Sequence, residues 1–299
     1  MATLYQQRSR NVLKTYLLMG GFFAVVVLVG WAISWYYDSP GILYGAVALS
    51  LIMNVGSYWF SDKIALSMNG ARPASREEFF DLYTVTENLA ITAGLPMPKL
   101  YVIEDPAPNA FATGRDEKHA VVAATTGLLA ILDRAELEGV IAHELSHIQN
   151  KDMLVMTVAV VLAGFVAIIA DIFLRMSLLG GGDRDSDSKA GLIVMVLAVV
   201  AIILAPIAAQ LIQLAISRRR EFLADSSGAL LTRYPEGLAS ALRKIAGDGR
   251  PMRRANHATA HLFIGDPFGS KAGQFVNRLF ATHPPVEARV AALLGSSAK

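Results

Sequence analysis

The 299-residue sequence has no cysteine and few charged residues, and each of these absences excludes a class of function. Without cysteine there is no disulfide bond, no thiol nucleophile and no thiolate ligand for a metal ion. Charged residues make up 17% of the chain, against about 25% in soluble domains. The 27 Lys and Arg residues nearly balance the 25 Asp and Glu residues, so the net charge of +2 gives no broad basic surface. We therefore expect no nucleic-acid partner.

Hydrophobic residues are abundant instead, at 54% of the chain with a mean hydropathy of +0.43. A helix that crosses a bilayer needs about 20 apolar residues, because the hydrocarbon offers its backbone no hydrogen-bond partners. Four stretches qualify, and we predict membrane-spanning helices at residues 16–37, 42–60, 153–173 and 190–217. Two alternatives stay open: a cleaved signal peptide for the first stretch, and a buried helix of a soluble domain for the third.

Lys and Arg residues predict the orientation of these helices, since cytoplasmic loops carry an excess of positive charge. Arg8, Arg10 and Lys14 precede the first helix, and three arginines at 218–220 follow the fourth. We expect a multi-pass protein of the cell (plasma or inner) membrane with both termini in the cytosol. Its predicted cytosolic parts are residues 1–15, 61–152 and 218–299. The two longer parts are expected to pack together into one domain.

A metal-binding pattern lies near the end of the first long cytosolic part. Asp133 stands three residues before a glutamate, which is the spacing of a capping box, so a helix is predicted to begin near Arg134. On this helix His143 and His147 project from one face, and their imidazoles can bind a single Zn²⁺. Glu144 lies beside them and can take a proton from water instead of binding the metal. This arrangement is typical of metallopeptidases; a surface helix with two solvated histidines is the alternative.

A catalytic zinc ion needs a third protein ligand and an open position for water. Glu221 and Asp225 follow the fourth predicted span four residues apart, so they share a helix face. Glu221 is the candidate third ligand. Asp225 is the candidate acceptor for the second N–H of a zinc-bound histidine, which would fix the tautomer of that ring. An ordinary charge cluster at the membrane edge is the alternative.

Residues before the zinc-binding helix favour a small sheet. Strands are predicted at residues 99–103, 110–112 and 119–124. An unpaired edge of this sheet can bind an extended peptide through main-chain hydrogen bonds, with little demand on its side chains. The candidate substrate-binding residues at such an edge are Asn109, Ala110, Phe111 and Ala112. An ordinary hairpin of the core is the alternative interpretation.

His283 is a second candidate catalytic residue, because two prolines follow it and stiffen the backbone there. It could donate a hydrogen bond to the oxyanion that forms opposite the zinc. Alternatively, it caps the C-terminal helix. Arg289, about one helical turn further on, shares either role and is counted among the candidate substrate-binding residues.

Several motifs together give the chain a family resemblance. They are Pro-Asn-Ala-Phe-Ala-Thr-Gly at 108–114, His-Glu-Leu-Ser-His at 143–147, Arg-Glu-Phe-Leu-Ala-Asp at 220–225 and Thr-His-Pro-Pro at 282–285. With the paired N-terminal spans, the sequence resembles the HtpX family of bacterial membrane zinc proteases, which are relatives of the prenyl-protein CaaX endopeptidases. The resemblance covers essentially the whole chain. It implies that Glu221 is the third zinc ligand, and that the biological role is membrane-protein quality control during stress.

The predicted fold is an α-rich integral membrane protein with four transmembrane helices and a zincin-like α+β metalloprotease domain in the cytosol. The predicted activity is that of an endopeptidase with one Zn²⁺ per subunit, which cleaves misfolded or damaged membrane proteins. A CaaX-type processing protease is the alternative within the same class. A zinc transporter or a non-catalytic zinc-binding scaffold are alternatives from other classes. The sequence leaves the oligomeric state open.

Overall fold

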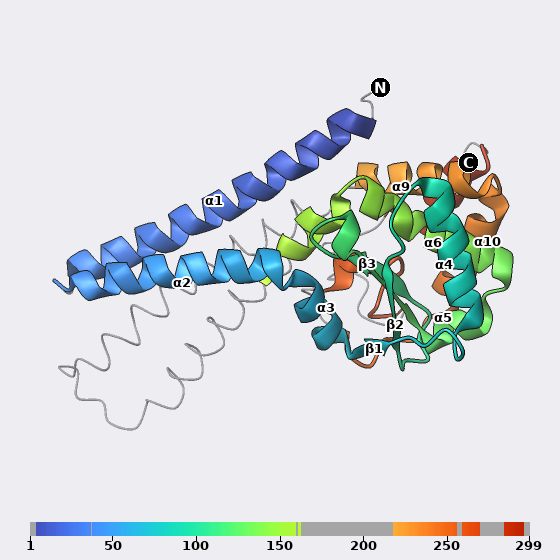
Figure 1. Cartoon of the computed structure of the whole chain (residues 1–299), viewed down its shortest axis with the longest axis horizontal. Helices are drawn as coiled ribbons and strands as arrows, with labels where there is room; N and C mark the ends of the chain where they lie inside the picture. The colour runs from blue at the N-terminus through green and yellow to red at the C-terminus, as the bar shows by residue number, and fades with distance from the viewer. Residues whose placement is uncertain are drawn as a thin grey trace.

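The computed structural model describes residues 4–36, 38–159, 161–162, 218–255, 259–269 and 284–295. Figure 1 shows two long helices, α1 and α2, that project from a body made of a small sheet and the remaining helices. The fourth predicted span and most of the third lie outside the described residues. The described part is rich in helix and includes residues from both segments that were expected to form one domain.

Helices α1 (Leu4–Tyr36) and α2 (Pro40–Trp59) pack against each other as a hairpin. Two windows in the described chain, Asn11–Trp31 and Pro40–Trp59, are long and apolar enough to cross a membrane. Only 17% and 22% of these windows are buried inside the structure, so most of their apolar surface faces outward. This confirms the first two predicted spans as candidate membrane helices.

The first helix is longer than predicted. Residues 4–15 continue the span without interruption, because this segment contains no glycine or proline that would end a helix. At 1.5 Å per residue the 33 residues of α1 extend about 50 Å, more than the roughly 30 Å of bilayer hydrocarbon. One end of α1 therefore has enough length to reach the body of the protein.

The sheet has four strands in the order β1-β2-β4-β3. The predicted strands are confirmed as β2 (Lys99–Ile103), β3 (Ala110–Thr113) and β4 (Val121–Thr125), although the last begins two residues later than predicted because His119 belongs to a 3-10 helix. β2 runs parallel to β4, whereas β3 is antiparallel to β4 and β1 is antiparallel to β2. The short strand β1 (Ala71–Pro73) was not predicted, since three residues that include a proline carry no strand pattern.

Helix α6 (Arg134–Gln149) is the centre of the body, and 12 of its 16 residues are buried. The predicted capping box is present: Asp133 accepts from the Glu136 N–H, and the Glu136 carboxylate accepts from the Asp133 N–H at 2.9 Å. The helices packed against α6 are α4 (Phe80–Ala93), α9 (Arg218–Thr232) and α10 (Pro235–Asp248). The remaining short elements are α3 (Ser61–Asn69), η1 (Glu117–His119), α5 (Thr126–Ile131), η2 (Ala260–Leu262) and α12 (Val286–Leu293).

Candidate metal centre

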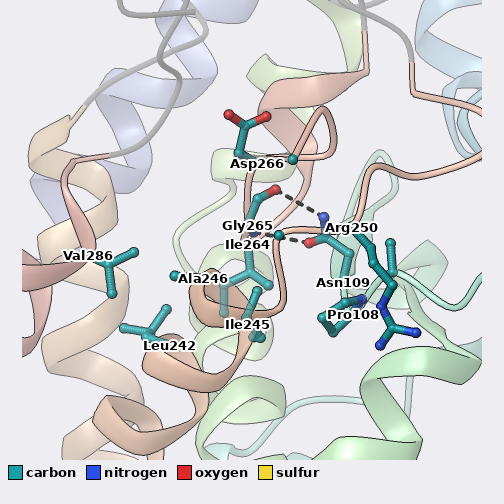
Figure 2. A pocket seen from close by; sticks show the side chains of 13 residues that line it. Pro108, Asn109, Leu242, Ile245, Ala246, Arg250, Ile264, Gly265, Asp266 and Val286 are labelled. Carbon is teal, nitrogen blue, oxygen red and sulfur yellow. Dashed lines mark hydrogen bonds between the residues drawn. The ribbon is translucent and has the colours of Figure 1, made fainter. Parts of the chain in front are cut away.

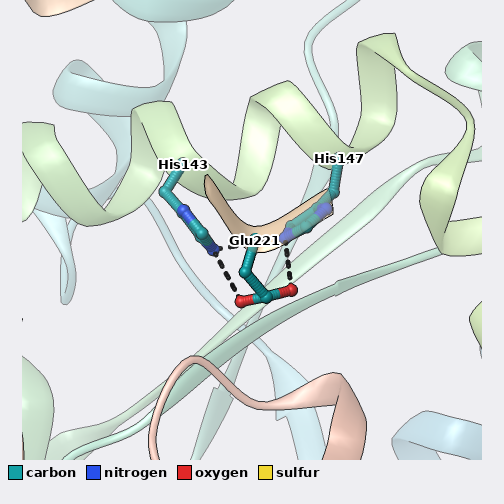
Figure 3. A group of neighbouring side chains, drawn as sticks. All are labelled: His143, His147 and Glu221. Carbon is teal, nitrogen blue, oxygen red and sulfur yellow. Dashed lines mark hydrogen bonds and ion pairs between the residues drawn. The ribbon is translucent and has the colours of Figure 1, made fainter. Parts of the chain in front are cut away.

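Three potential metal ligands converge where α6 meets α9. His143 and His147 extend from one face of α6, and Glu221 of α9 lies opposite them (Figure 3). The two Nε2 atoms are 3.2 Å apart, and the Glu221 oxygens lie 3.9 Å from His143 Nε2 and 3.6 Å from His147 Nε2. All three side chains are buried. The structure thus brings together the ligand set that the sequence predicts.

The second nitrogen of each histidine faces a buried carboxylate. His143 Nδ1 lies 3.0 Å from Asp225 Oδ1, and His147 Nδ1 lies 3.3 Å from Asp152 Oδ2. A carboxylate at Nδ1 favours a proton on that atom, so both Nε2 lone pairs point into the same small space. Two facing lone pairs with an added carboxylate form a donor set suited to a cation.

Asp152 is the functional residue that sequence reasoning missed. The sequence shows an acid five residues after His147, just past the end of the same helix, but the spacing alone does not place it beside the histidine. Its position next to His147 depends on a chain reversal at Lys151, which adopts a positive φ of 57°. Local sequence patterns do not predict this left-handed residue, because lysine rarely adopts it.

Burial and neighbouring charges shift the pKa values of both histidines. Burial lowers the pKa of His143 to about 4, against the opposing effect of Asp225. Burial also acts to lower the pKa of His147, but Asp152, Glu221 and Glu144 outweigh it and raise that pKa to about 9. The surroundings of His147 therefore favour positive charge, which a bound metal ion would also supply.

Glu144 lies between the two histidines in sequence but outside the converging cluster. Its side chain is 1% exposed, and the backbone N–H of Ala112 in β3 donates to its carboxylate. Burial raises the pKa of Glu144 to about 7; Glu221 acts in the same direction, whereas His147 and the Ala112 N–H oppose the shift. A carboxyl group with this pKa can both accept and release a proton near neutral pH.

A further layer of side chains holds the acid that faces His143. Arg289 of α12 is 1% exposed and forms two hydrogen bonds to Asp225, from Nε at 2.8 Å and from Nη2 at 2.7 Å. Its Nη1 also donates to the Ile264 carbonyl at 3.2 Å. These bonds place Arg289 behind Asp225, where it positions the acid. A direct substrate contact for Arg289 stays a prediction.

Glycine allows α9 to approach α6 at the histidines. A Cβ atom on Gly228 would lie 2.9 Å from the backbone nitrogen of His143 and 3.2 Å from the Ala142 carbonyl carbon, closer than ordinary contacts. Only a residue without a side chain fits here while Glu221 and Asp225 stay within reach of His143. One glycine within a helical stretch gives no such indication in the sequence.

The residues expected to bind substrate are mostly engaged in the fold. Figure 2 shows the Asn109 side chain hydrogen-bonded to both the N–H and the carbonyl of Gly265. Both bonds are 3.0 Å long, and Asn109 lines a cavity of about 160 Å³. The Ala110 carbonyl accepts from the Ile264 N–H at 2.9 Å. Phe111 is fully buried and packs edge-on against Phe263. None of the metal-centre residues lines this cavity.

Ala112 is the remaining member of the set. In the β3–β4 register its main chain points away from β4, because Asn109, three positions earlier, points towards β4 and its carbonyl accepts from the Thr125 N–H. Its N–H faces Glu144, so this part of the strand edge borders the site. His283 lies outside the described residues, and its role stays a prediction.

Comparison with known proteins identifies the family. The family model described as peptidase family M48 matches residues 76–297, a segment that contains every residue of the metal centre. The chain belongs to peptidase family M48. It is therefore a membrane-associated metalloendopeptidase, with His143, His147 and Glu221 as the group that fits its metal ion.

Curated relatives match over nearly the full chain. A protease HtpX homolog of Caldanaerobacter subterraneus subsp. tengcongensis is 47% identical, and one of Thermoanaerobacter pseudethanolicus is 46% identical, with 96% of each chain covered. A third, from Streptococcus gordonii, is 45% identical over 96% of this chain and 98% of its own. These matches confirm the resemblance to HtpX proteases.

The fold also resembles a solved structure. The crystal structure of S. mikatae Ste24p aligns with a TM-score of 0.53 at 18% identity, and the match covers 97% of this chain and 66% of the Ste24p chain. At this identity the likeness concerns the fold alone. This chain spans about two thirds of the length of that structure.

Proposed function

We propose that this M48 peptidase is a zinc endopeptidase that hydrolyses peptide bonds of misfolded or damaged membrane proteins at a cytosolic site. The observation that carries the proposal is the convergence of His143, His147 and Glu221 next to a buried Glu144 that is not part of the cluster. Two imidazoles and a carboxylate form a known ligand set of catalytic zinc, with one position left for water or substrate.

The distances support zinc. Zn–N bonds of about 2.0–2.1 Å in a tetrahedral site place two ligand nitrogens roughly 3.3 Å apart. The two Nε2 atoms are 3.2 Å apart, and the shorter distance from Glu221 to a histidine nitrogen is 3.6 Å. Small movements of the Glu221 side chain therefore suffice for coordination. The absence of cysteine agrees with this set of nitrogen and oxygen donors.

His143, His147 and Glu221 would hold the zinc ion, which would supply Lewis acidity towards the scissile carbonyl and the attacking water. Glu144 takes a proton from the attacking water and delivers it to the leaving amine, two transfers that its pKa near 7 permits. Asp225 and Asp152 hold the tautomers of the two histidines during this cycle. His283 donates a hydrogen bond to the developing oxyanion.

The substrate lies extended along the outer edge of β3. Of the main-chain groups at this edge, the Ala112 N–H donates to Glu144 and the Ala110 carbonyl accepts from the Ile264 N–H, so pairing with the substrate is centred on the Ala112 carbonyl. Recognition through the main chain of an extended segment is available only to unfolded stretches of a substrate. This geometry favours misfolded proteins of varied sequence over one defined substrate.

For the membrane arrangement we propose four spans, with both termini and the active site in the cytosol. The outward-facing apolar surface of α1 and α2 supports the first two spans. The positive residues that flank the predicted spans support the orientation. A reporter enzyme fused after Lys299 tests it: activity specific to the cytosol is expected, and activity specific to the periplasm would reverse the orientation.

The alternative functions are less well supported. Processing of CaaX proteins is less supported because the curated relatives described above are named HtpX homologs. A transporter requires ligands at membrane depth. His143 and His147 lie instead in the body, on a helix packed among α4, α9 and α10. A non-catalytic zinc-binding scaffold does not explain why a carboxyl group is buried at Glu144.

The test is zinc content and casein cleavage measured on the full chain purified in detergent, on its Glu221→Gln variant and on an Arg76→Gln variant as a surface control. Arg76 is exposed, pairs with the exposed Glu87 and is not one of the metal ligands. We expect about one zinc per chain and cleavage in wild type and control, and loss of both in Glu221→Gln. Unchanged zinc and cleavage in Glu221→Gln would remove Glu221 from the site.

A further inference from the structure

The N-terminal helix reaches the metal centre through one side chain. Asn11 of α1 is 1% exposed, and its Nδ2 donates to Asp152 Oδ1 at 2.5 Å and to the Asn150 carbonyl at 3.0 Å. These partners lie 139 and 141 positions away in the sequence. Asp152 is itself completely buried, and its other oxygen faces His147 Nδ1 at 3.3 Å. A continuous path of polar contacts therefore links α1 to a metal ligand.

Asp152 begins a new helical segment directly after the turn that follows α6. α6 ends at Gln149, and the chain reverses at Lys151 with a φ of 57°. A left-handed conformation costs a non-glycine residue roughly 1 kcal/mol and persists only where surrounding contacts fix it. The amide of Asn11 bridges the residues on either side of Lys151, namely Asn150 and Asp152, so it fastens both sides of this reversal.

The negative charge of Asp152 is balanced by a buried arginine of α9. Arg220 Nε of α9 lies 3.6 Å from Asp152 Oδ1, and the arginine is 2% exposed. The guanidinium nitrogens of Arg220 have no hydrogen-bond partner among the described residues. The short hydrogen bond from Asn11 is therefore the directional contact that sets the orientation of the carboxylate towards His147.

We propose that Asn11 is a positioning residue of the metal centre, so that the cytosolic end of the first membrane helix completes the peptidase site. This inference rests on the proposed zinc peptidase function. α1 then has two roles: its apolar part anchors the protein, and its first three turns orient Asp152 and, through it, His147. Substitution of Asn11 therefore lowers the affinity for zinc, although it removes none of the metal ligands.

The test measures the dissociation constant for Zn²⁺ by chelator competition on the full chain in detergent. Partners behind a metal-bound histidine are worth about 10–100-fold in metal affinity. We expect Asp152→Ala to weaken zinc within that range, and Asn11→Ala to weaken it about 3–10-fold, since it acts through Asp152. Thr15→Val is the matched control, because Thr15 is equally buried one turn along α1 and donates only to the Asn11 carbonyl. Its affinity should stay within about twofold of wild type.

Two comparisons separate positioning from packing. The double variant Asn11→Ala with Asp152→Ala should bind zinc as weakly as Asp152→Ala alone, since the two residues act in series. Asn11→Asp should be worse than Asn11→Ala, because it places a second carboxylate against Asp152. A role in packing alone predicts the reverse order, as aspartate keeps the shape of asparagine. If Asn11→Ala does not fold, Asn11→Asp is compared with Asn11→Ser instead. The zinc affinity of Asn11→Ser should then be the closer of the two to wild type.

The outcomes also distinguish this inference from the proposed function. Wild-type affinity in Asn11→Ala, or additive losses in the double variant, would overturn the role of Asn11 while Glu221→Gln still loses zinc. Zinc binding that is unaffected by Glu221→Gln would overturn the site itself, and the inference with it.

Discussion

The close packing of α9 on α6 can be tested by adding one methyl group at Gly228. The Cβ of alanine would lie 2.9 Å from the His143 nitrogen, and ordinary contacts begin at 3.4 Å, so the helices must separate by about half an ångström. The three nearest contact atoms, the backbone N and Cα of His143 and the carbonyl carbon of Ala142, all belong to the backbone and cannot rotate away. Metal sites tolerate deviations of about 0.2 Å in ligand distances. Gly228→Ala therefore moves Glu221 and Asp225 out of range of His143.

Gly247→Ala is the matched control. Gly247 is an exposed helical glycine in α10, and a Cβ atom there meets nothing within 4 Å. Alanine in place of glycine favours a helix by about 1 kcal/mol, a gain that both variants share. Overpacking costs about 1–3 kcal/mol and applies to Gly228→Ala alone.

The assay is thermal unfolding followed by circular dichroism in detergent, together with zinc affinity. Relative to Gly247→Ala, Gly228→Ala should lower the melting temperature by roughly 2–12 °C, at about 2–4 °C per kcal/mol for a domain of this size. It should also weaken zinc binding at least about tenfold. Equal melting temperatures and equal zinc affinities in the two variants would refute the argument that contact at Gly228 sets the ligand geometry.

The remaining predictions concern catalysis and acid stability. His283→Ala should lower kcat by about 10²–10³-fold and leave zinc content unchanged, the loss expected for one oxyanion donor; an unchanged kcat would return His283 to a structural role. Burial acts to raise the pKa of Glu136, but hydrogen bonds from Lys244 at 2.7 Å and Ser240 at 2.6 Å outweigh it and lower that pKa. Ionised Glu136 therefore stabilises the fold above its unfolded pKa near 4.5, and this contribution is lost as the pH falls through the lower folded value. Glu136→Gln should lower the free energy of unfolding by about 1–2 kcal/mol at pH 7. Below about pH 5 its melting temperature should depend less on pH than that of the wild type; the same dependence in both proteins would refute this assignment.

The parts of the site that follow from local sequence were predictable. The capping box placed the start of α6, and the four-residue spacing of His143 and His147 fixed their common face. The same periodicity gave Glu221 and Asp225 a common face on α9. These features depend only on helix geometry, so no knowledge of the tertiary fold was needed.

The parts that depend on tertiary contacts were not predictable. Asp152 reaches His147 through a left-handed residue, and Asn11 reaches Asp152 from 141 positions away. Gly228 matters only because the His143 backbone lies against it. Phe111 occupies an edge strand by sequence pattern, yet its side chain is part of the core beside Phe263. In each case the partner comes from another element, which a one-dimensional pattern does not specify.

The most direct test of the central claim is the Glu144→Gln variant, because this change keeps the shape of the side chain and removes its ability to accept a proton. Zinc content and the rate of casein cleavage are measured on wild type and variant purified in the same way. We predict about one zinc per chain in both proteins and a rate at least about 10²-fold lower in the variant, the usual contribution of a general base. A variant that holds zinc and cleaves at the wild-type rate would contradict the assignment of Glu144 and the mechanism built on it.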